Sequence, residues 1–162
     1  METAEILEIL EDWNFWKKGQ ETGIERKEYL QKLDEIGNAG QVIAITGVRR
    51  SGKSTIMRQY IKNLMQNGVK PENILYVNFE DRRFTELSLA LLNKIYDLYL
   101  EHLSPGPKPY ILLDEVHKIE GWEKFARTMH ELGKAKVIVS GSSAKLLSSS
   151  ISSVLTGRHL DM

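Results

Sequence analysis

Hydrophobic and polar residues alternate in blocks along the chain, and these blocks predict a regular succession of strands and helices. Short apolar runs rich in β-branched residues are typical of strands buried on both faces, and such runs lie at 42–45, 74–79, 110–113 and 136–140. Apolar residues recur at helical spacing over 53–66, 85–103 and 122–132, and a short helix is expected after residue 143. Because strands that alternate with helices form crossover units, the sequence predicts an α/β fold: a parallel sheet with helices on both sides, in the strand order 1-4-3-2.

The first 40 residues form a different kind of segment. Helical patterns cover 3–12 and 25–36, and the aromatic residues Trp13, Phe15 and Trp16 follow the first of them. The two tryptophans are expected either to pack the N-terminal segment onto the core or to stack on an adenine base. We therefore divide the chain into a helical lead-in at 1–40 that packs on the core and a core domain at 41–162.

A glycine-rich loop joins the first predicted core strand to the helix that follows. It reads Gly-Val-Arg-Arg-Ser-Gly-Lys-Ser from Gly47 to Ser54, which is the phosphate-binding or Walker A pattern. The glycines let backbone N–H groups converge on a phosphate, and the helix N-terminus points its positive end at the same anion. Lys53 is expected to reach the β- and γ-phosphates, and Ser54 to offer its hydroxyl to Mg²⁺. The predicted nucleotide-binding residues are Gly47, Arg49, Arg50, Ser51, Gly52, Lys53, Ser54 and Thr55; for the two arginines, contact with a neighbouring subunit or plain solvation are the alternatives.

Two adjacent carboxylates follow the third core strand directly. Ligands bind at the carboxyl edge of parallel sheets, so Asp114 and Glu115 are expected beside the phosphate loop. Asp114 is then the Walker B acid that holds Mg²⁺, and Glu115 orients and polarises the attacking water. A pair of solvated turn acids is the alternative, which the apolar residues just before Asp114 disfavour.

The spacing of the two motifs indicates the subclass. About 60 residues separate Lys53 from Asp114, enough for a helix, a strand and a second helix. This arrangement, with a glutamate after the aspartate, belongs to the additional-strand group of phosphate-loop ATPases with a three-layer α/β/α core. A GTPase would be expected to carry an Asn-Lys-x-Asp guanine clamp, and the sequence has none.

Serines end the fourth core strand. In the additional-strand group this strand tip carries a polar residue that senses the γ-phosphate or holds the water, and Ser142 is the preferred candidate, with Ser143 as the other. The competing interpretation is a serine-rich turn that caps the next helix.

Several segments together resemble a known family. They are the phosphate loop, Tyr76–Asp81, the stretch from Leu112 to Glu123, the serine-rich tip with Leu146-Leu147, and Thr156-Gly157-Arg158. In this order they resemble the prokaryotic AAA-type ATPases common in archaea, whose members usually continue into a C-terminal domain of uncharacterised function. The resemblance implies ATP rather than GTP, and Arg158 as an arginine near the γ-phosphate that acts within or between subunits. The family also supplies a fifth core strand after Arg158, and no apolar run predicts one here, so we expect the last core strand and the C-terminal domain to be missing.

Composition and charge add exclusions. The chain has 162 residues and no cysteine, which excludes disulfides and thiolate metal sites. Its 22 basic and 22 acidic residues balance, so no global charge favours nucleic acid or a membrane surface. No apolar stretch approaches the length of a membrane span, and the acidic N-terminus is unlike a signal peptide, so a cytoplasmic location is expected.

These observations predict an ATPase. We expect ATP binding and slow Mg²⁺-dependent hydrolysis that drives a conformational switch. Two other uses of ATP stay open: a subunit of an oligomeric, DNA-acting AAA-type motor or loader, and a non-hydrolysing ATP-binding interaction module. The expected partners are ATP, further copies of the chain, and a protein partner reached through the C-terminal domain.

Overall fold

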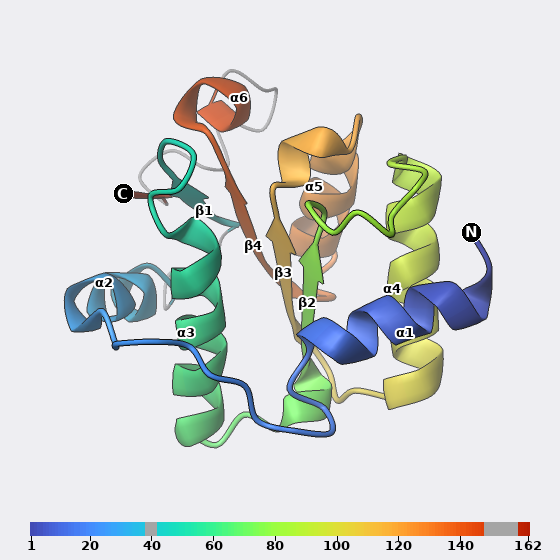
Figure 1. Cartoon of the computed structure of the whole chain (residues 1–162), viewed down its shortest axis with the longest axis horizontal. Helices are drawn as coiled ribbons and strands as arrows, with labels where there is room; N and C mark the ends of the chain where they lie inside the picture. Colours follow the sequence, from blue (N-terminus) through green and yellow to red (C-terminus); the bar gives the residue numbers. More distant parts are fainter. Residues whose placement is uncertain (38–41, 148–158) are drawn as a thin grey trace.

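Five parallel strands form a single sheet between two layers of helices (Figure 1). The computed structural model describes residues 1–37, 42–147 and 159–162. The strands are β1 (Ile43–Thr46), β2 (Ile74–Asn78), β3 (Tyr110–Asp114), β4 (Lys136–Gly141) and β5 (His159–Asp161). They lie in the order β2-β3-β4-β1-β5, and every neighbouring pair is parallel. The predicted order of the first four strands is confirmed, and β4 with β3 separates the phosphate-loop strand from β2.

The expectation that the last core strand is missing was wrong. Strand β5 pairs with β1, with Ala44 opposite His159 and Thr46 opposite Asp161, so β1 is an interior strand. The backbone N–H of Met162 extends this pairing by donating to the carbonyl of Thr46 at 2.8 Å. The strand has one buried apolar residue, Leu160, between two exposed polar ones. A single apolar residue leaves no run to recognise, so the sequence pattern could not predict it.

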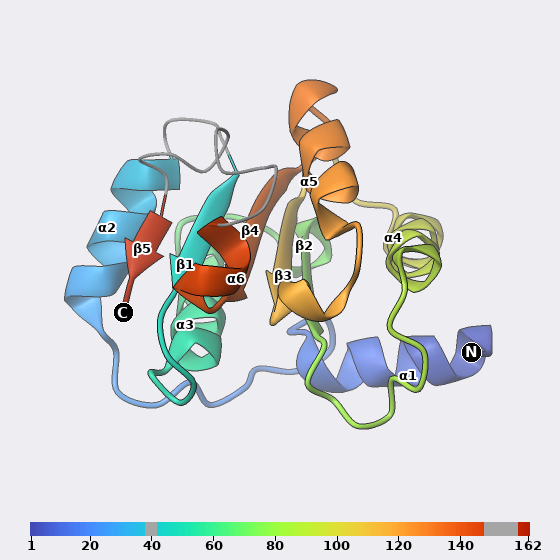
Figure 2. The same cartoon turned by 90° about the horizontal axis from the view of Figure 1, so that it is seen from above.

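Helices cover both faces of the sheet (Figures 1 and 2). One face is covered by α1 (Thr3–Trp13), α4 (Leu89–Leu103) and α5 (Trp122–Glu131), and the other by α2 (Lys27–Gly37) and α3 (Lys53–Gln66). A short helix, α6 (Ser143–Leu147), follows the tip of β4, and 3-10 turns lie at Pro71–Asn73 and Val116–Lys118. Among the described residues, no helix combines the length and the apolarity needed to cross a membrane.

The strands contribute apolar side chains to both layers because successive residues of a strand point to opposite faces. In β3, Ile111 and Leu113 belong to the core cluster under α4 and α5, whereas Leu112 belongs to the cluster under α2 and α3. All three are fully buried. This burial on both sides explains why the core strands appear in the sequence as continuous apolar runs.

The N-terminal segment packs on the sheet through apolar and aromatic contacts. Helix α1 buries Ile6, Ile9 and Leu10 in the cluster that also contains α4 and α5. The indole of Trp16 stacks on Tyr99 with ring centroids 6.0 Å apart, and its N–H donates to the carbonyl of Ile74 at 2.8 Å, at the start of β2. Trp16 therefore lies at the edge of the sheet opposite the phosphate loop, in the packing role rather than the adenine-stacking one.

Helix α4 begins at Leu89, four residues later than the periodicity predicts. Ser88 precedes it, and its Oγ accepts a hydrogen bond from the backbone N–H of Leu91 at 3.1 Å. A serine in this position is a strong helix N-cap, so the start of the helix is set by this local hydrogen bond.

Candidate nucleotide-binding site

The phosphate loop crosses from the end of β1 to the start of α3. Gly52 stands before the helix with φ +98°, and no side chain caps the first turn of α3 among the described residues. The first N–H groups of α3 consequently face the loop without a side-chain acceptor, the arrangement in which a helix N-terminus binds an anion. Glycine suits this place because residues with a side chain rarely adopt a φ of +98°.

Lys53 is held at the centre of this loop. Its side chain is 5% exposed, and its Nζ donates to the carbonyls of Gly47 at 3.0 Å and Val48 at 2.9 Å. The same Nζ lies 3.9 Å from Oε1 of Glu115. The ammonium thus lies between the phosphate loop and the tip of β3. A bound phosphate group could replace the Gly47 and Val48 carbonyls as its acceptors.

Asp114 is fully buried behind Lys53 and is anchored by two hydroxyls. The phenol of Tyr76 donates to Oδ2 at 2.6 Å, and Oγ of Ser140 donates to Oδ1 at 2.5 Å. Burial and the neighbouring Asp114 raise the pKa of Tyr76 well above its ordinary value, so the phenol remains a donor.

The donor set has the chemistry that Mg²⁺ prefers. Ser54 and Asp114 offer oxygen only, and Mg²⁺ typically takes one or two such protein ligands together with substrate phosphates and water. Within the described residues, no group of three or more His, Asp or Glu side chains could hold a metal by itself. The residues present therefore fit a magnesium ion that arrives with a nucleotide.

Glu115 leaves the strand in a left-handed conformation, with φ 57° and ψ 44°. Its backbone N–H donates to Oγ of Ser140 at 2.9 Å, so the serine that anchors Asp114 also holds the turn at Glu115. Burial, followed by the negative charge of Asp114, raises the pKa of the Glu115 carboxyl above its ordinary value. A carboxylate with a raised pKa beside a phosphate site is a suitable proton acceptor.

Two serines near the tip of β4, Ser140 and Ser142, make different contacts in the site. Ser142 lines the hollow beside Lys53 and Glu115, and its Oγ also accepts from the backbone N–H of Lys145 at 3.3 Å, as a cap of α6. Ser140, which the sequence analysis did not select, is the serine that contacts both acidic residues. Ser140 lies within β4, two residues before Ser142, and β4 pairs with β3.

Two hollows flank the phosphate loop and share Lys53 and Glu115. One, of about 280 Å³, lies over the start of α3 and is lined by Arg50, Gly52, Lys53, Ser54, Thr55 and Glu115. The other, of about 270 Å³, faces the tip of β4 and is lined by Gly47, Arg49, Lys53, Glu80, Glu115, His117, Lys118, Ser142 and Lys145. Seven of the eight predicted nucleotide-binding residues line one or other of these hollows; Ser51 and the buried Asp114 line neither. Arg158 and the side chain of Ser143 lie outside the described residues.

The segment from Thr22 to Arg26, here called the N-terminal strap, is bound to α3 by Gln59, which no sequence motif indicated. The buried side chain of Gln59 on α3 donates to the carbonyls of Thr22 and Ile24 at 2.8 and 2.7 Å, and accepts from the N–H of Arg26 at 3.0 Å. This fixes the strap on α3 and brings Nη1 of Arg26 within 3.3 Å of the Ser51 carbonyl. The contact joins residues 25 positions apart, so no local motif reveals it.

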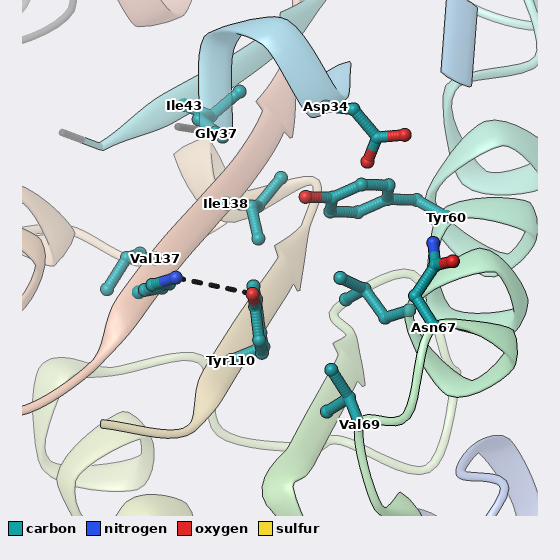
Figure 3. A pocket seen from close by; sticks show the side chains of 11 residues that line it. Asp34, Gly37, Ile43, Tyr60, Asn67, Val69, Tyr110, Val137 and Ile138 are labelled. Atoms are coloured by element: carbon teal, nitrogen blue, oxygen red, sulfur yellow. Dashed lines mark hydrogen bonds between the residues drawn. The ribbon is translucent and has the colours of Figure 1, made fainter. Parts of the chain in front are cut away.

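A further cavity, of about 220 Å³, lies at the opposite edge of the sheet (Figure 3). Asp34, Tyr60, Asn67 and Tyr110 surround an apolar floor that includes Ile138, and Tyr110 accepts a hydrogen bond from Lys136 at 3.3 Å. None of the residues predicted to bind nucleotide or metal lines this cavity. We therefore assign the functional site to the phosphate loop, where the charged groups converge.

Comparison with known proteins agrees with this geometry. The AAA domain family matches residues 39–162, which is most of the chain. The chain belongs to the AAA domain family. This membership supports an ATP-binding, AAA-type domain.

Two curated relatives carry no described function. The AAA domain is 36% identical over 140 residues to an uncharacterised protein of Haemophilus influenzae, covering 86% of this chain and 34% of that protein. It is 32% identical over 120 residues to an uncharacterised protein of Methanocaldococcus jannaschii, covering 74% of this chain and 25% of that one. The chain thus spans about a third and a quarter of the lengths of these relatives.

A solved structure shares the fold. The crystal structure of a DNA replication initiation factor superposes with a TM-score of 0.54, covering 84% of this chain and 44% of that one at 17% sequence identity. At this identity the likeness shows the fold of the AAA domain, a phosphate-loop α/β/α domain.

Proposed function

We propose that this AAA domain binds ATP with Mg²⁺ and hydrolyses it slowly to drive a conformational change. The observation that carries the proposal is the convergence of Lys53 and Glu115 on the phosphate loop, 3.9 Å apart, with Asp114 anchored behind them. These are a phosphate-binding cation, a proton acceptor and a metal-binding carboxylate, which are the groups that phosphoryl transfer to water requires.

Each residue has a distinct part in the proposed reaction. The N–H groups of the loop and the first turn of α3 bind the phosphates, and Lys53 exchanges the Gly47 and Val48 carbonyls for phosphate oxygens. Ser54 and Asp114 would hold Mg²⁺, which neutralises charge on the phosphate oxygens when it is bound. Glu115 orients a water molecule and accepts its proton as the oxygen attacks.

The contacts of Lys53 and of the phosphate loop support slow turnover and a change of shape. Lys53 must give up two carbonyl contacts and its ion pair with Glu115 before it can bind phosphate. Gly47 lies close to Ser51 and to the carbonyl of Met162, which follows β5. A movement of the phosphate loop would therefore also displace the end of β5. Arg26 links the same loop to the N-terminal strap.

The direct test separates binding from hydrolysis. Lys53→Ala is expected to abolish ATP binding in a fluorescent-nucleotide titration, because no other described side chain occupies the centre of the loop. Glu115→Gln is expected to bind ATP–Mg²⁺ within about threefold of the wild-type affinity and to lose turnover by roughly 100-fold or more.

Matched controls lie on exposed positions. Lys62→Ala removes a lysine from the same helix as Lys53, and Glu8→Gln makes the same change as Glu115→Gln on α1; both residues are exposed. Both controls are expected to bind and turn over ATP like the wild type. Wild-type binding without turnover would instead support the non-hydrolysing ATP-binding module.

A DNA-acting AAA-type subunit is the second candidate. The observation in its favour is the fold shared with a DNA replication initiation factor. This use predicts assembly into oligomers with ATP and stimulation of turnover by DNA. Sizing and ATPase measurements with and without duplex DNA test it, and a monomer that ignores DNA would exclude it.

A further inference from the structure

Two side-chain nitrogens lie within 4 Å of the Glu115 carboxylate in the described part of the chain. Nζ of Lys53 lies 3.9 Å from Oε1, and Nε2 of His117 lies 3.4 Å from Oε2. The proposed reaction moves Lys53 onto the phosphates. His117 is then the contact that stays with the carboxylate, and it does so from the same short 3-10 turn, Val116–Lys118.

His117 is enclosed rather than solvated. Its side chain is 15% exposed, and its Nδ1 is buried without a hydrogen-bond partner among the described residues. The ionised carboxylate of Glu115 only accepts hydrogen bonds, so a proton on Nε2 finds a partner whereas one on Nδ1 finds none. Orphaned buried N–H groups are rare in proteins. The proton of a neutral His117 therefore belongs on Nε2, which faces Glu115.

Gly141, the last residue of β4, leaves the space that the imidazole ring of His117 occupies beside Glu115. A Cβ on Gly141 would lie 2.9 Å from Nδ1 of His117 and 3.0 Å from Cγ of Leu146, so the ring fits only because residue 141 has no side chain. Burial, and then the positive charges of Lys145 and Lys118, lower the pKa of His117. The ring is thus a neutral donor rather than an ion-pair partner near neutral pH.

We propose that His117 is a positioning residue whose Nε2–H fixes Oε2 of Glu115, leaving Oε1 free to accept a proton from the attacking water. The inference rests on the proposed hydrolysis. The present distance of 3.4 Å is long for a hydrogen bond, as catalytic contacts often are before the substrate is bound. Departure of Lys53 to the phosphates lets the pair close.

Two substitutions distinguish positioning from packing. The amide nitrogen of glutamine reaches about as far as Nε2 of histidine, whereas that of asparagine reaches only as far as Nδ1. His117→Asn is therefore expected to lower kcat roughly 10-fold or more while the dissociation constant for ATP–Mg²⁺ stays within about twofold, since misplacement of a catalytic group acts on the chemical step. His117→Gln is expected to restore most of kcat.

The control is His130→Asn, the same change on the last turn of α5, and it is expected to leave kcat unaltered. The proposal is overturned if His117→Asn keeps the wild-type kcat, or if the Gln and Asn variants lose activity equally. A wild-type chain that binds ATP but shows no turnover contradicts the proposed hydrolysis instead.

A second measurement does not depend on turnover. Long-range ¹H–¹⁵N spectra of the nucleotide-free chain, with His117 assigned through His117→Asn, are expected to show the neutral Nε2–H tautomer. Glu115→Gln should shift the Nε2 resonance and leave those of the other three histidines in place. The Nδ1–H tautomer, or an Nε2 resonance that ignores Glu115→Gln, would rule the contact out.

Discussion

The proposed magnesium ligand Asp114 is oriented by the hydroxyl of Tyr76. Tyr76 is fully buried, and its hydroxyl donates to Oδ2 of Asp114 at 2.6 Å. A hydroxyl that donates to a buried carboxylate both satisfies the charge and fixes the direction of its free lone pairs. At the scale of single residues, the orientation of Asp114 is therefore set by the strand next to it.

Tyr76→Phe tests this role. Removal of the hydroxyl leaves Asp114 short of a donor, so the free energy of unfolding should fall by about 1–3 kcal/mol. The gain in ATP affinity that Mg²⁺ provides should also shrink, by roughly 10-fold, as for other groups that orient a metal ligand. Denaturant unfolding and nucleotide titrations with and without Mg²⁺ measure the two effects.

Tyr99→Phe is the matched control. It removes another buried hydroxyl, which donates to the carbonyl of Glu72 at 2.7 Å on the far edge of the sheet. Its unfolding free energy should fall similarly, with no change in the effect of Mg²⁺. Equal loss of the magnesium effect in both variants would contradict the role of Tyr76.

At the scale of elements, helix α1 is attached to the loop after β2 by a partly buried acid, Asp81. Asp81 receives hydrogen bonds from Arg83 at 2.7 and 3.0 Å and from the indole of Trp13 at 2.7 Å. Arg83 also reaches Asp12 on α1 at 2.7 Å. The hydrogen bond from Arg83 and that from Trp13 hold the pKa of Asp81 well below its usual range, against the opposing effect of burial.

Asp81→Asn is expected to lower the unfolding free energy by about 1–3 kcal/mol at pH 7, because hydrogen bonds to a charged acceptor are lost. A carboxyl with a depressed folded pKa contributes stability that is present above the unfolded pKa of about 4 and is lost as the pH falls below it. The difference between wild type and variant should thus be constant from pH 7 to about pH 5 and shrink below about pH 4. Urea unfolding across this range measures it.

Asp12→Asn serves as the comparison for the same network. The Asp12 side chain is 54% exposed, so its ion pair with Arg83 is screened by water. Its loss should change the unfolding free energy by less than about 1 kcal/mol. An Asp12 variant as unstable as the Asp81 variant would show that the exposed pair, not the partly buried acid, attaches α1.

At the scale of the whole molecule, β5 closes the side of the sheet that carries the phosphate loop. Without it, β1 would present unpaired backbone groups at an edge, a template for pairing with another chain. Leu160 is 3% exposed and packs in the cluster formed with α2 and α3. Strand β5 also contacts the residue just before the phosphate loop: Oγ1 of Thr46 donates to Asp161 at 2.9 Å.

Leu160→Ala should detach this strand in part. The expected loss is about 2–4 kcal/mol in the free energy of unfolding, the usual result of a cavity in a core. Light scattering should then increase with protein concentration as the edge of β1 becomes exposed. Leu132→Ala, at a position that is 62% exposed, is the control and should change neither quantity. Unaltered unfolding and scattering in the Leu160 variant would mean that β5 contributes little to the sheet.

The sequence by itself determined the parallel α/β fold, the order of four strands and the phosphate loop. Apolar runs such as Ile111–Leu113 indicate burial on both faces of the sheet. The glycine spacing of the loop indicates a backbone that wraps around a phosphate. Both features depend on residues that are close in the sequence. Asp114 and Glu115 could be placed beside that loop because all parallel strands end at one edge.

The tertiary structure alone decided the groups that hold this site in place. Tyr76, Ser140, Gln59 and the strand around Leu160 act on partners at least 25 positions away, so no spacing along the chain reveals them. The start of α4 was missed for a different reason, since one capping serine outweighed the helical period. Local patterns determine which elements form, whereas hydrogen bonds between elements determine which polar residue meets which.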